Sequence, residues 1–150
     1  MITTDITIES ADEATLPALL SLLAASGLPP EGLSDHLPTA LIARDHDQVI
    51  GSAALELYGS SALLRSVAVA PAYQGQGLGQ QLTRAAIDLA QQRGVTDLYL
   101  LTETAGAFFP KFGFSPIDRA DVPTQVKESL EFTTLCPDSA LVMAASVPAK

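Results

Sequence analysis

The chain has 150 residues, of which 47% are hydrophobic, and this size and composition suit one globular domain with its own core. Its formal net charge is -9 with only 8 Lys and Arg residues, which argues against nucleic acid or an anionic membrane surface as a partner because both need a basic patch. The single cysteine, Cys136, excludes an intrachain disulfide and a multi-thiolate metal site. We therefore expect a single domain over residues 1–150.

The beginning of the chain lacks the features of a targeting signal. Residues 1–9 have no basic start followed by an apolar run, and no apolar stretch approaches the length of a membrane span. Together with the lone cysteine, these features predict a cytoplasmic protein. His36 and His46 lie in no metal-ligand spacing, so we interpret both as surface or loop residues and expect no metal.

The first predicted elements are a strand and a helix. The strand contains Ile2, Ile6 and Ile8, interleaved with threonine. Ser10 and Glu13 have the spacing of a capping box, which predicts the start of a helix. Gly27 and Pro29 end this helix. Its apolar face is formed by Leu16, Leu19, Leu20 and Leu23.

The next segments predict a short helix and three strands. Residues 30–37 read as a short second helix that serves either as a linker over the sheet or as a substrate lid. Residues 40–44 and 49–58 predict paired strands, joined by a turn at Asp45, His46 and Asp47. A turn at Gly59, Ser60 and Ser61 leads into the third strand, residues 63–70.

A glycine-spaced loop follows that strand. The strand stops at Pro71, three glycines occupy positions 75, 77 and 79, and apolar residues then recur at helical spacing. The glycines let the backbone turn its N–H groups inward, and the helix adds four unbonded N–H groups and the positive end of its dipole. This combination predicts an anion site whose guest is a diphosphate.

Three alternatives apply to this loop. The dinucleotide-binding pattern G-x-G-x-x-G needs another glycine spacing, and the P-loop needs a lysine that is absent. The third alternative is a tight strand-to-helix turn without a ligand. The coincidence of the glycines, Pro71 and a later Gly113-Phe114 pair favours the anion site.

The second half of the chain continues the alternation of strands and helices. The helix that starts at Gly77 extends to about Gln92 and closes at Gly94. The next predicted elements are a buried strand at 95–101 and a short helix at 105–109, which we expect to kink or stop at Pro110. A strand region begins at Phe114, the segment 122–129 is ambiguous, and a final strand is predicted at 140–145. The order predicts a mixed α/β sheet covered by helices.

The loop also resembles a known family. The diphosphate-binding motif of the GNAT family of N-acetyltransferases is Q/R-x-x-G-x-G/A, and this loop matches it with Gln74-Gly75-Gln76-Gly77-Leu78-Gly79. A later segment of the chain, Phe-Phe-Pro-Lys-Phe-Gly-Phe at residues 108–114, resembles the late segment of that family. The resemblance implies a mixed, mostly antiparallel sheet with splayed central strands, flanked by helices. It also implies acetyl-CoA as co-substrate, no metal, a small-molecule amine as acceptor, and a homodimer as one option.

The same resemblance assigns residues to the cofactor. The backbone of Val67, Ala68 and Val69 would bind the pantetheine amides, with the thioester near Val67 and the Val67 N–H placed to stabilise an oxyanion. Many relatives carry a tyrosine as general acid where this chain has Phe109, so Tyr58, Tyr99, a water or direct transfer within the intermediate must substitute. The remaining cofactor-binding candidates are Gln74, Gly75, Gln76, Gly77, Leu78, Gly79, Gln80 and Phe109.

Glu56 is the candidate base. It lies in an otherwise apolar strand, where a lone carboxylate is costly unless it is paired or useful. Strand alternation places Glu56 and Tyr58 on one face, and Arg65 on the face of Val67 and Val69. If the two strands pair, Glu56 and Arg65 are neighbours, and a structural ion pair is then an equal alternative to a catalytic base.

Three residues are candidates for the acceptor site. Arg65 would bind a substrate carboxylate bidentately, Tyr58 lies on the face of Glu56, and Thr104 lies with Glu103 at the end of the splayed strand.

Three segments carry a finer resemblance. Residues 63–69, 98–104 and 131–137 resemble acetyltransferases encoded with bacterial arsenic-resistance genes, and the Leu-Leu-Thr segment followed by Phe108-Phe109 resembles the acetyltransferase domain of N-acetylglutamate synthase. Both imply the α-amino group of an amino acid, or of a toxic analogue, as acceptor. The alternatives are a non-catalytic sensor of acetyl-CoA or an amino acid, and a protein acetyltransferase.

Overall fold

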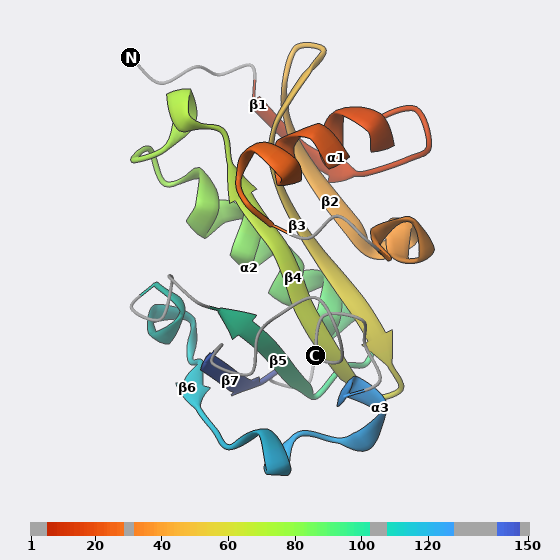
Figure 1. The fold of residues 1–150 in the computed structure, drawn as a ribbon, viewed down its shortest axis with the longest axis vertical. Helices are drawn as coiled ribbons and strands as arrows, with labels where there is room; N and C mark the ends of the chain where they lie inside the picture. Colours follow the sequence, from red (N-terminus) through yellow and green to blue (C-terminus); the bar gives the residue numbers. More distant parts are fainter. Residues whose placement is uncertain (1–5, 29–31, 103–107, 128–140, 148–150) are drawn as a thin grey trace.

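A seven-stranded mixed sheet forms the centre of the computed structural model, which describes residues 6–28, 32–102, 108–127 and 141–147 (Figure 1). The order of the strands is β1-β2-β3-β4-β5-β7-β6. Every pairing is antiparallel except that of β4 with β5. The strands are β1 (Ile6–Ser10), β2 (Ala40–Asp45), β3 (Gln48–Tyr58), β4 (Ser61–Val69), β5 (Asp97–Thr102), β6 (Ser115–Pro116) and β7 (Leu141–Ser146). The predicted mixed, mostly antiparallel sheet is confirmed.

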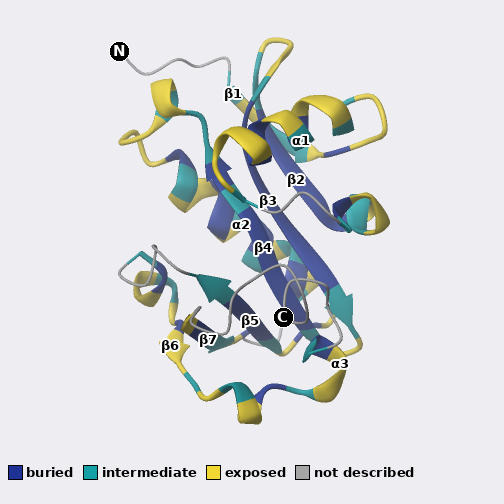
Figure 2. Cartoon of the chain, viewed as in Figure 1, coloured by how far each residue is buried: buried dark blue, intermediate teal, exposed yellow. Residues whose placement is uncertain are grey.

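Helices cover both faces of this sheet (Figure 2). Leu82 and Ala86 of α2 pack with Leu55 of β3 in one core cluster, whereas Leu23 of α1 packs with Ala54 in another. Successive residues of β3 thus enter opposite cores, as strand geometry requires. The helical elements are α1 (Leu16–Ala25), η1 (Leu33–Thr39), η2 (Pro71–Tyr73), α2 (Leu78–Gln92), η3 (Phe109–Phe112), η4 (Arg119–Asp121) and α3 (Thr124–Lys127).

The long helix α2 lies very close to β3. A Cβ built on Gly51 would come within 2.8 Å of Leu82 Cδ1, a separation that forces something to move. Gly51 therefore allows the helix that follows the glycine loop to pack directly on the central strand. Among the described residues, no helix is long and apolar enough to cross a membrane.

The entry to α1 differs from the predicted capping box. β1 extends through Ser10, and the reciprocal hydrogen bonds join Asp12 and Thr15 instead: Thr15 N–H donates to Asp12 Oδ1 at 2.9 Å, and Asp12 N–H donates to Thr15 Oγ1 at 2.9 Å. The Ser10 and Glu13 box was wrong because Ser10 is held in the sheet. Ile2 of the predicted first strand lies outside the described residues.

The predicted strands of the middle of the chain are confirmed to within two residues at each end, although Asp45 and Ser61, which were expected in turns, belong to β2 and β4. β2 and β3 pair around the turn at His46, and the helix α2 closes at Gly94, which has a φ of 79°. The predicted second short helix is the 3-10 helix η1, whose described residues end at Thr39 rather than Leu37.

β4 contains a bulge at Ser66. Two of its residues, Ser66 and Val67, lie opposite the single residue Ala53 of β3. Ser66 has a φ of 60°, the left-handed region that L-residues rarely adopt. A bulge adds one residue to a strand, and it therefore reverses the side-chain alternation beyond it. The prediction that Arg65 shares a face with Val67 and Val69 was wrong for this reason.

The strands β4 and β5 diverge beside that bulge. Their parallel pairing ends at the pair of Leu63 and Tyr99, although β4 continues to Val69 and β5 to Thr102. Figure 1 shows the two strands separating toward their carboxyl ends. The expected splay of the central strands is confirmed.

The later elements include one correction. The helical turn η3 begins at Phe109, so Pro110 occupies its first turn, where a missing N–H costs nothing. The expected kink or stop at Pro110 was wrong in the described part, and residues 105–107 of the predicted helix lie outside the described residues. Within the ambiguous segment, Thr124–Lys127 forms α3, and residues 128 and 129 lie outside the described residues. The final strand is β7. β7 lies between β5 and β6 rather than at an edge of the sheet.

Candidate active site

The glycine loop has the backbone geometry of an anion cradle. Gly75 and Gly77 have φ values of 81° and 83°, and a Cβ on either would meet no protein atom within 4 Å. Gly77 is the N-cap of α2 and makes no side-chain capping hydrogen bond. Because the first turn of a helix leaves its N–H groups without intrahelical partners, the start of α2 offers donors to a bound anion.

Two side-chain contacts tie this loop to the sheet. Gln74 Nε2 donates to the carbonyl of Val69 at 2.9 Å, and the Tyr73 hydroxyl donates to Asp45 Oδ2 at 2.5 Å. The bond from Tyr73 lowers the pKa of Asp45 below its ordinary value and raises the pKa of Tyr73. The sequence did not predict this contact because Asp45, the last residue of β2, lies 28 residues earlier in the chain.

An aromatic cluster lies beside the loop. The Phe108 ring is 3.7 Å from the position of a Cβ on Gly79, and its centroid is 5.1 Å from that of buried Phe109. Lys111 Nζ lies 5.0 Å from the centroid of Phe108, and Arg84 lies over Phe112. Two of the chain's 8 Lys and Arg residues therefore pack on this aromatic cluster, a grouping that sequence spacing did not indicate.

Side chains brace the bulge of β4. The Ser52 hydroxyl donates to the carbonyl of Ser66 at 2.6 Å, and Arg65 Nε donates to Ser66 Oγ at 3.1 Å. All three residues are buried. The bulge therefore has fixed polar partners, and it sets the direction of the residues that follow it in β4, which are Val67, Ala68 and Val69.

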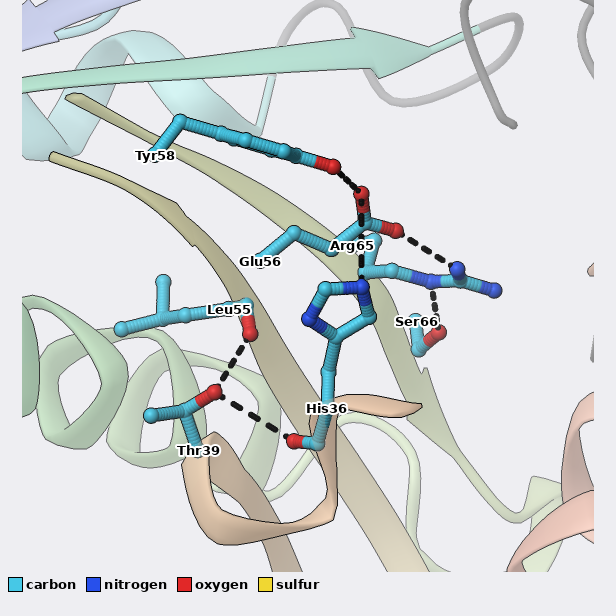
Figure 3. Close-up of polar contacts among 7 residues, drawn as sticks. All are labelled: His36, Thr39, Leu55, Glu56, Tyr58, Arg65 and Ser66. Atoms are coloured by element: carbon cyan, nitrogen blue, oxygen red, sulfur yellow. Dashed lines mark hydrogen bonds and ion pairs between the residues drawn. The ribbon is translucent and has the colours of Figure 1, made fainter. Parts of the chain in front are cut away.

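Glu56 is the centre of a buried polar cluster (Figure 3). Arg65 Nη1 donates to Glu56 Oε2 at 2.7 Å, and the Tyr58 hydroxyl donates to Oε1. The side chain of Glu56 is 2% exposed and that of Arg65 is 0% exposed. The predictions that Glu56 neighbours Arg65 and shares a face with Tyr58 are confirmed.

His36 extends this cluster toward solvent. Its Nε2 lies 3.9 Å from Glu56 Oε1, and its side chain is 25% exposed. The interpretation of His36 as a surface or loop residue agrees with this partial exposure, but it missed the contact with Glu56, which arises because η1 folds over β3. His46, which is 74% exposed in the β2–β3 turn, fits that interpretation.

The remaining candidates are dispersed. Tyr99 is 9% exposed and packs with Leu63 and Val142, and burial raises the pKa of its hydroxyl. Glu103, Thr104 and Cys136 lie outside the described residues. Within the described part of the chain, no group of three or more His, Cys, Asp or Glu side chains could hold a metal ion.

A hollow of about 950 Å³ lies between α1 and the β2–β3 turn. It is lined by Leu22, Asp45, Val49 and Pro71, among others, so it borders the start of the glycine loop. Glu56 lies seven residues beyond Val49 along β3, roughly 23 Å away at about 3.3 Å per residue. The hollow and the Glu56 cluster are therefore separate features.

The family follows from comparison of the chain with family models. A model described as "Acetyltransferase (GNAT) domain" matches residues 37–116, more than half of the chain. The chain belongs to the GNAT acetyltransferase family. The matched residues include β2 to η3, and thus the bulge, the glycine loop and Glu56.

Two curated GNAT relatives are similar over part of this chain. An uncharacterized N-acetyltransferase of Chlorobaculum tepidum is 29% identical over 97 residues, 64% of this chain, and the amino-acid acetyltransferase of Aeromonas salmonicida is 31% identical over 79 residues, 51% of this chain. The aligned region spans 62% of the first relative and 18% of the second.

Solved structures of GNAT proteins share this fold. N-acetylglutamate synthase of Neisseria gonorrhoeae, complexed with coenzyme A and N-acetyl-glutamate, matches with a TM-score of 0.82 at 20% identity, over 98% of this chain and 36% of that one. The ribosomal-protein-S18-alanine N-acetyltransferase of Escherichia coli matches with a TM-score of 0.74 at 24% identity, over 97% and 96% of the two chains.

Proposed function

We propose that this GNAT protein transfers the acetyl group of acetyl-CoA to the amine of a small acceptor. The observation that carries the proposal is the succession of a bulged, splayed strand and a glycine cradle within 14 residues, from Ser66 to Gly79. The first feature opens the sheet for an extended ligand, and the second offers N–H donors to its diphosphate. Coenzyme A has both an extended arm and a diphosphate.

The cofactor would be held mainly by backbone groups. The loop from Gln74 to Gln80 would bind the diphosphate through N–H groups and the dipole of α2. The backbone of Val67, Ala68 and Val69 would bind the pantetheine amides, with the thioester beside Val67. Such binding suits a chain with a net charge of -9, because backbone donors attract an anion without adding basic side chains. Phe109 would pack near the cofactor.

Glu56 would act as the general base. The acceptor ammonium loses one proton to Glu56, its nitrogen attacks the thioester carbon, and the Val67 N–H stabilises the resulting oxyanion. When the intermediate collapses, the carbon–sulfur bond breaks and the thiolate takes the second proton of the nitrogen. Phe109 has no hydroxyl to deliver that proton, so direct transfer, a water or the hydroxyl of Tyr58 or Tyr99 would do so.

The acceptor class we favour is the α-amino group of an amino acid or of a toxic amino-acid analogue, as in the arsenic-resistance subgroup. The amino-acid acetyltransferase and the N-acetylglutamate synthase among the similar proteins support this choice. Arg65 is the candidate partner for the substrate carboxylate. Its side chain is fully buried and bonded to Glu56, so a carboxylate would have to displace that bond to reach it.

A protein acceptor is the second candidate, because the Escherichia coli neighbour modifies the alanine of a ribosomal protein. The other assignments that we propose are a cytoplasmic location and assembly as a homodimer. Thr104 stays a proposed acceptor-site residue.

The proposal is tested by measuring free-thiol release from acetyl-CoA with amino acids, phosphinic and arsonic amino-acid analogues, polyamines and a basic peptide. Release with one α-amino compound would support the small-acceptor enzyme, and release with the peptide alone would support the protein acetyltransferase. Acetyl-CoA binding by calorimetry without release for any acceptor would contradict the proposal and favour a sensor. Absence of acetyl-CoA binding would contradict the cofactor assignment itself.

A further inference from the structure

The proposed reaction assigns no role to His36, although this residue lies against Glu56. Glu56 is 2% exposed, and a base buried to this degree must lose its proton before each new turnover. Arg65 on Oε2 cannot accept a proton because a guanidinium stays charged. The Tyr58 hydroxyl already donates to Oε1. The imidazole of His36, whose Nε2 lies 3.9 Å from Oε1, is a further neighbour of this carboxylate among the described residues, and an imidazole ring has nitrogens that can both accept and donate a proton.

The backbone of η1 fixes this histidine beside the base. His36 interrupts the helical turn with φ -122° and ψ 20°. The Thr39 hydroxyl is 3.3 Å from the carbonyl of His36 and 2.6 Å from that of Leu55, the residue before Glu56. Thr39 therefore links the turn that carries the imidazole to the strand that carries the carboxylate (Figure 3).

His36 also connects the cluster with solvent. Its side chain is 25% exposed, whereas those of Glu56 and Arg65 are 2% and 0% exposed. The distance of 3.9 Å between His36 Nε2 and Glu56 Oε1 is longer than a direct hydrogen bond. One bridging water, or a small rotation of the imidazole ring, would connect the two atoms.

We propose that His36 relays the proton from Glu56 to solvent, and that Thr39 is the positioning residue for this relay. The inference rests on the proposed acetyl transfer. The N–H bond of the acceptor ammonium breaks and its electron pair stays on nitrogen, while the proton passes to Glu56 Oε1. Glu56 then gives this proton to the neutral ring of His36, and the imidazolium releases a proton to water. The carboxylate and the neutral imidazole are restored for the next turnover.

The test compares the wild type with His36→Gln and with Ser34→Ala, a matched control at an exposed residue of the same turn. We expect His36→Gln to lower kcat at least about tenfold, to leave acetyl-CoA binding by calorimetry unchanged, and to regain activity when imidazole is added to the buffer. Ser34→Ala should keep the wild-type rate and show no response to imidazole. Thr39→Val should lower kcat with a smaller response to imidazole.

Two outcomes would overturn the relay. The first is a His36→Gln variant whose kcat stays within twofold of that of an active wild type. The second is a slow His36→Gln variant that imidazole does not restore, because a role limited to packing or charge does not respond to a free proton carrier. A wild type that binds acetyl-CoA but acetylates no acceptor contradicts the proposed function first and the relay with it, so the two failures are distinguishable.

Discussion

The guanidinium of Arg65 donates from Nη1 to Glu56 Oε2 at 2.7 Å, with both side chains buried in the sheet. Arg65 also donates from Nε to Ser66 Oγ, at the bulge of β4. Arg65 thus connects Glu56, the candidate base, with the bulge that sets the direction of β4 toward the proposed cofactor site. Removing one partner of a buried ion pair generally costs about 3–5 kcal/mol, so the structural and catalytic roles of Glu56 must be separated by experiment.

We predict that Glu56→Gln lowers kcat by about 100-fold or more, because general acid–base catalysis contributes on the order of 10²–10⁴ in rate. The affinity for acetyl-CoA should stay nearly unchanged, since Glu56 lies outside the glycine loop. Thiol-release kinetics and calorimetry measure the two quantities.

The control for this prediction is the double variant Glu56→Gln, Arg65→Met. Replacing the buried arginine, which has lost its carboxylate partner, with an apolar residue should recover part of the lost unfolding free energy, measured in urea, without recovering turnover. Recovery of turnover together with stability would mean that the pair is structural and that Glu56 is not the base.

The sequence predicted the glycine loop and its flanking elements better than the surroundings of Glu56. The loop depends on local signals: the stop at Pro71, the glycine spacing and the helical repeat of α2 lie within one continuous stretch. Alternation along β3 likewise placed Glu56 and Tyr58 on one face. These predictions needed no knowledge of distant contacts.

The errors arose where a tertiary contact or an irregularity decides the geometry. The bulge at Ser66 reverses the face of Val67 relative to Arg65, and no residue type in the strand signals it. The contact of His36 with Glu56 was missed because only the packing of η1 on β3 brings the two residues together. Asp45 reaches Tyr73 across a separation of 28 residues.

We predict that Ser52→Ala weakens both the fold and the binding of acetyl-CoA. Its hydroxyl is the donor to the carbonyl of Ser66 in the bulge, and leaving a buried carbonyl without its donor costs about 1–3 kcal/mol. Urea denaturation measures the stability, and KM for acetyl-CoA measures the cofactor geometry. Ser52→Thr, which keeps a hydroxyl, should retain more of both. A Ser52→Ala variant with wild-type KM would show that this bond does not shape the cofactor site.

We predict that Gly77→Val abolishes acetyl-CoA binding. The φ of 83° at Gly77 strains any L-residue, and the space beside its Cα, empty of protein atoms within 4 Å, is where the diphosphate would approach. Gly94→Val is the matched control, because Gly94 has a φ of 79°, equally open surroundings and a place at the other end of α2. Both variants should lose similar unfolding free energy, but only Gly77→Val should lose the calorimetric binding signal. Retained affinity in Gly77→Val would refute the loop assignment.

A final prediction concerns the pH dependence of the Asp12 and Thr15 pair at the start of α1. Hydrogen bonds from the Thr15 backbone N–H and hydroxyl hold the pKa of Asp12 below its ordinary value of 3.8. Since the folded state lowers this pKa, the stabilisation is fully present above pH 3.8 and is lost as the pH falls through the lowered pKa. Asp12→Asn should therefore lower the melting temperature at neutral pH, and its difference from the wild type should shrink toward pH 2.

Thermal unfolding at a series of pH values measures this difference, with Glu13→Gln as the control. That substitution removes a carboxylate from the same exposed turn without touching the Asp12 and Thr15 pair, so its effect should be small and should not follow the same pH course. A constant difference between Asp12→Asn and the wild type down to pH 2 would show that the ionised carboxylate does not stabilise this turn.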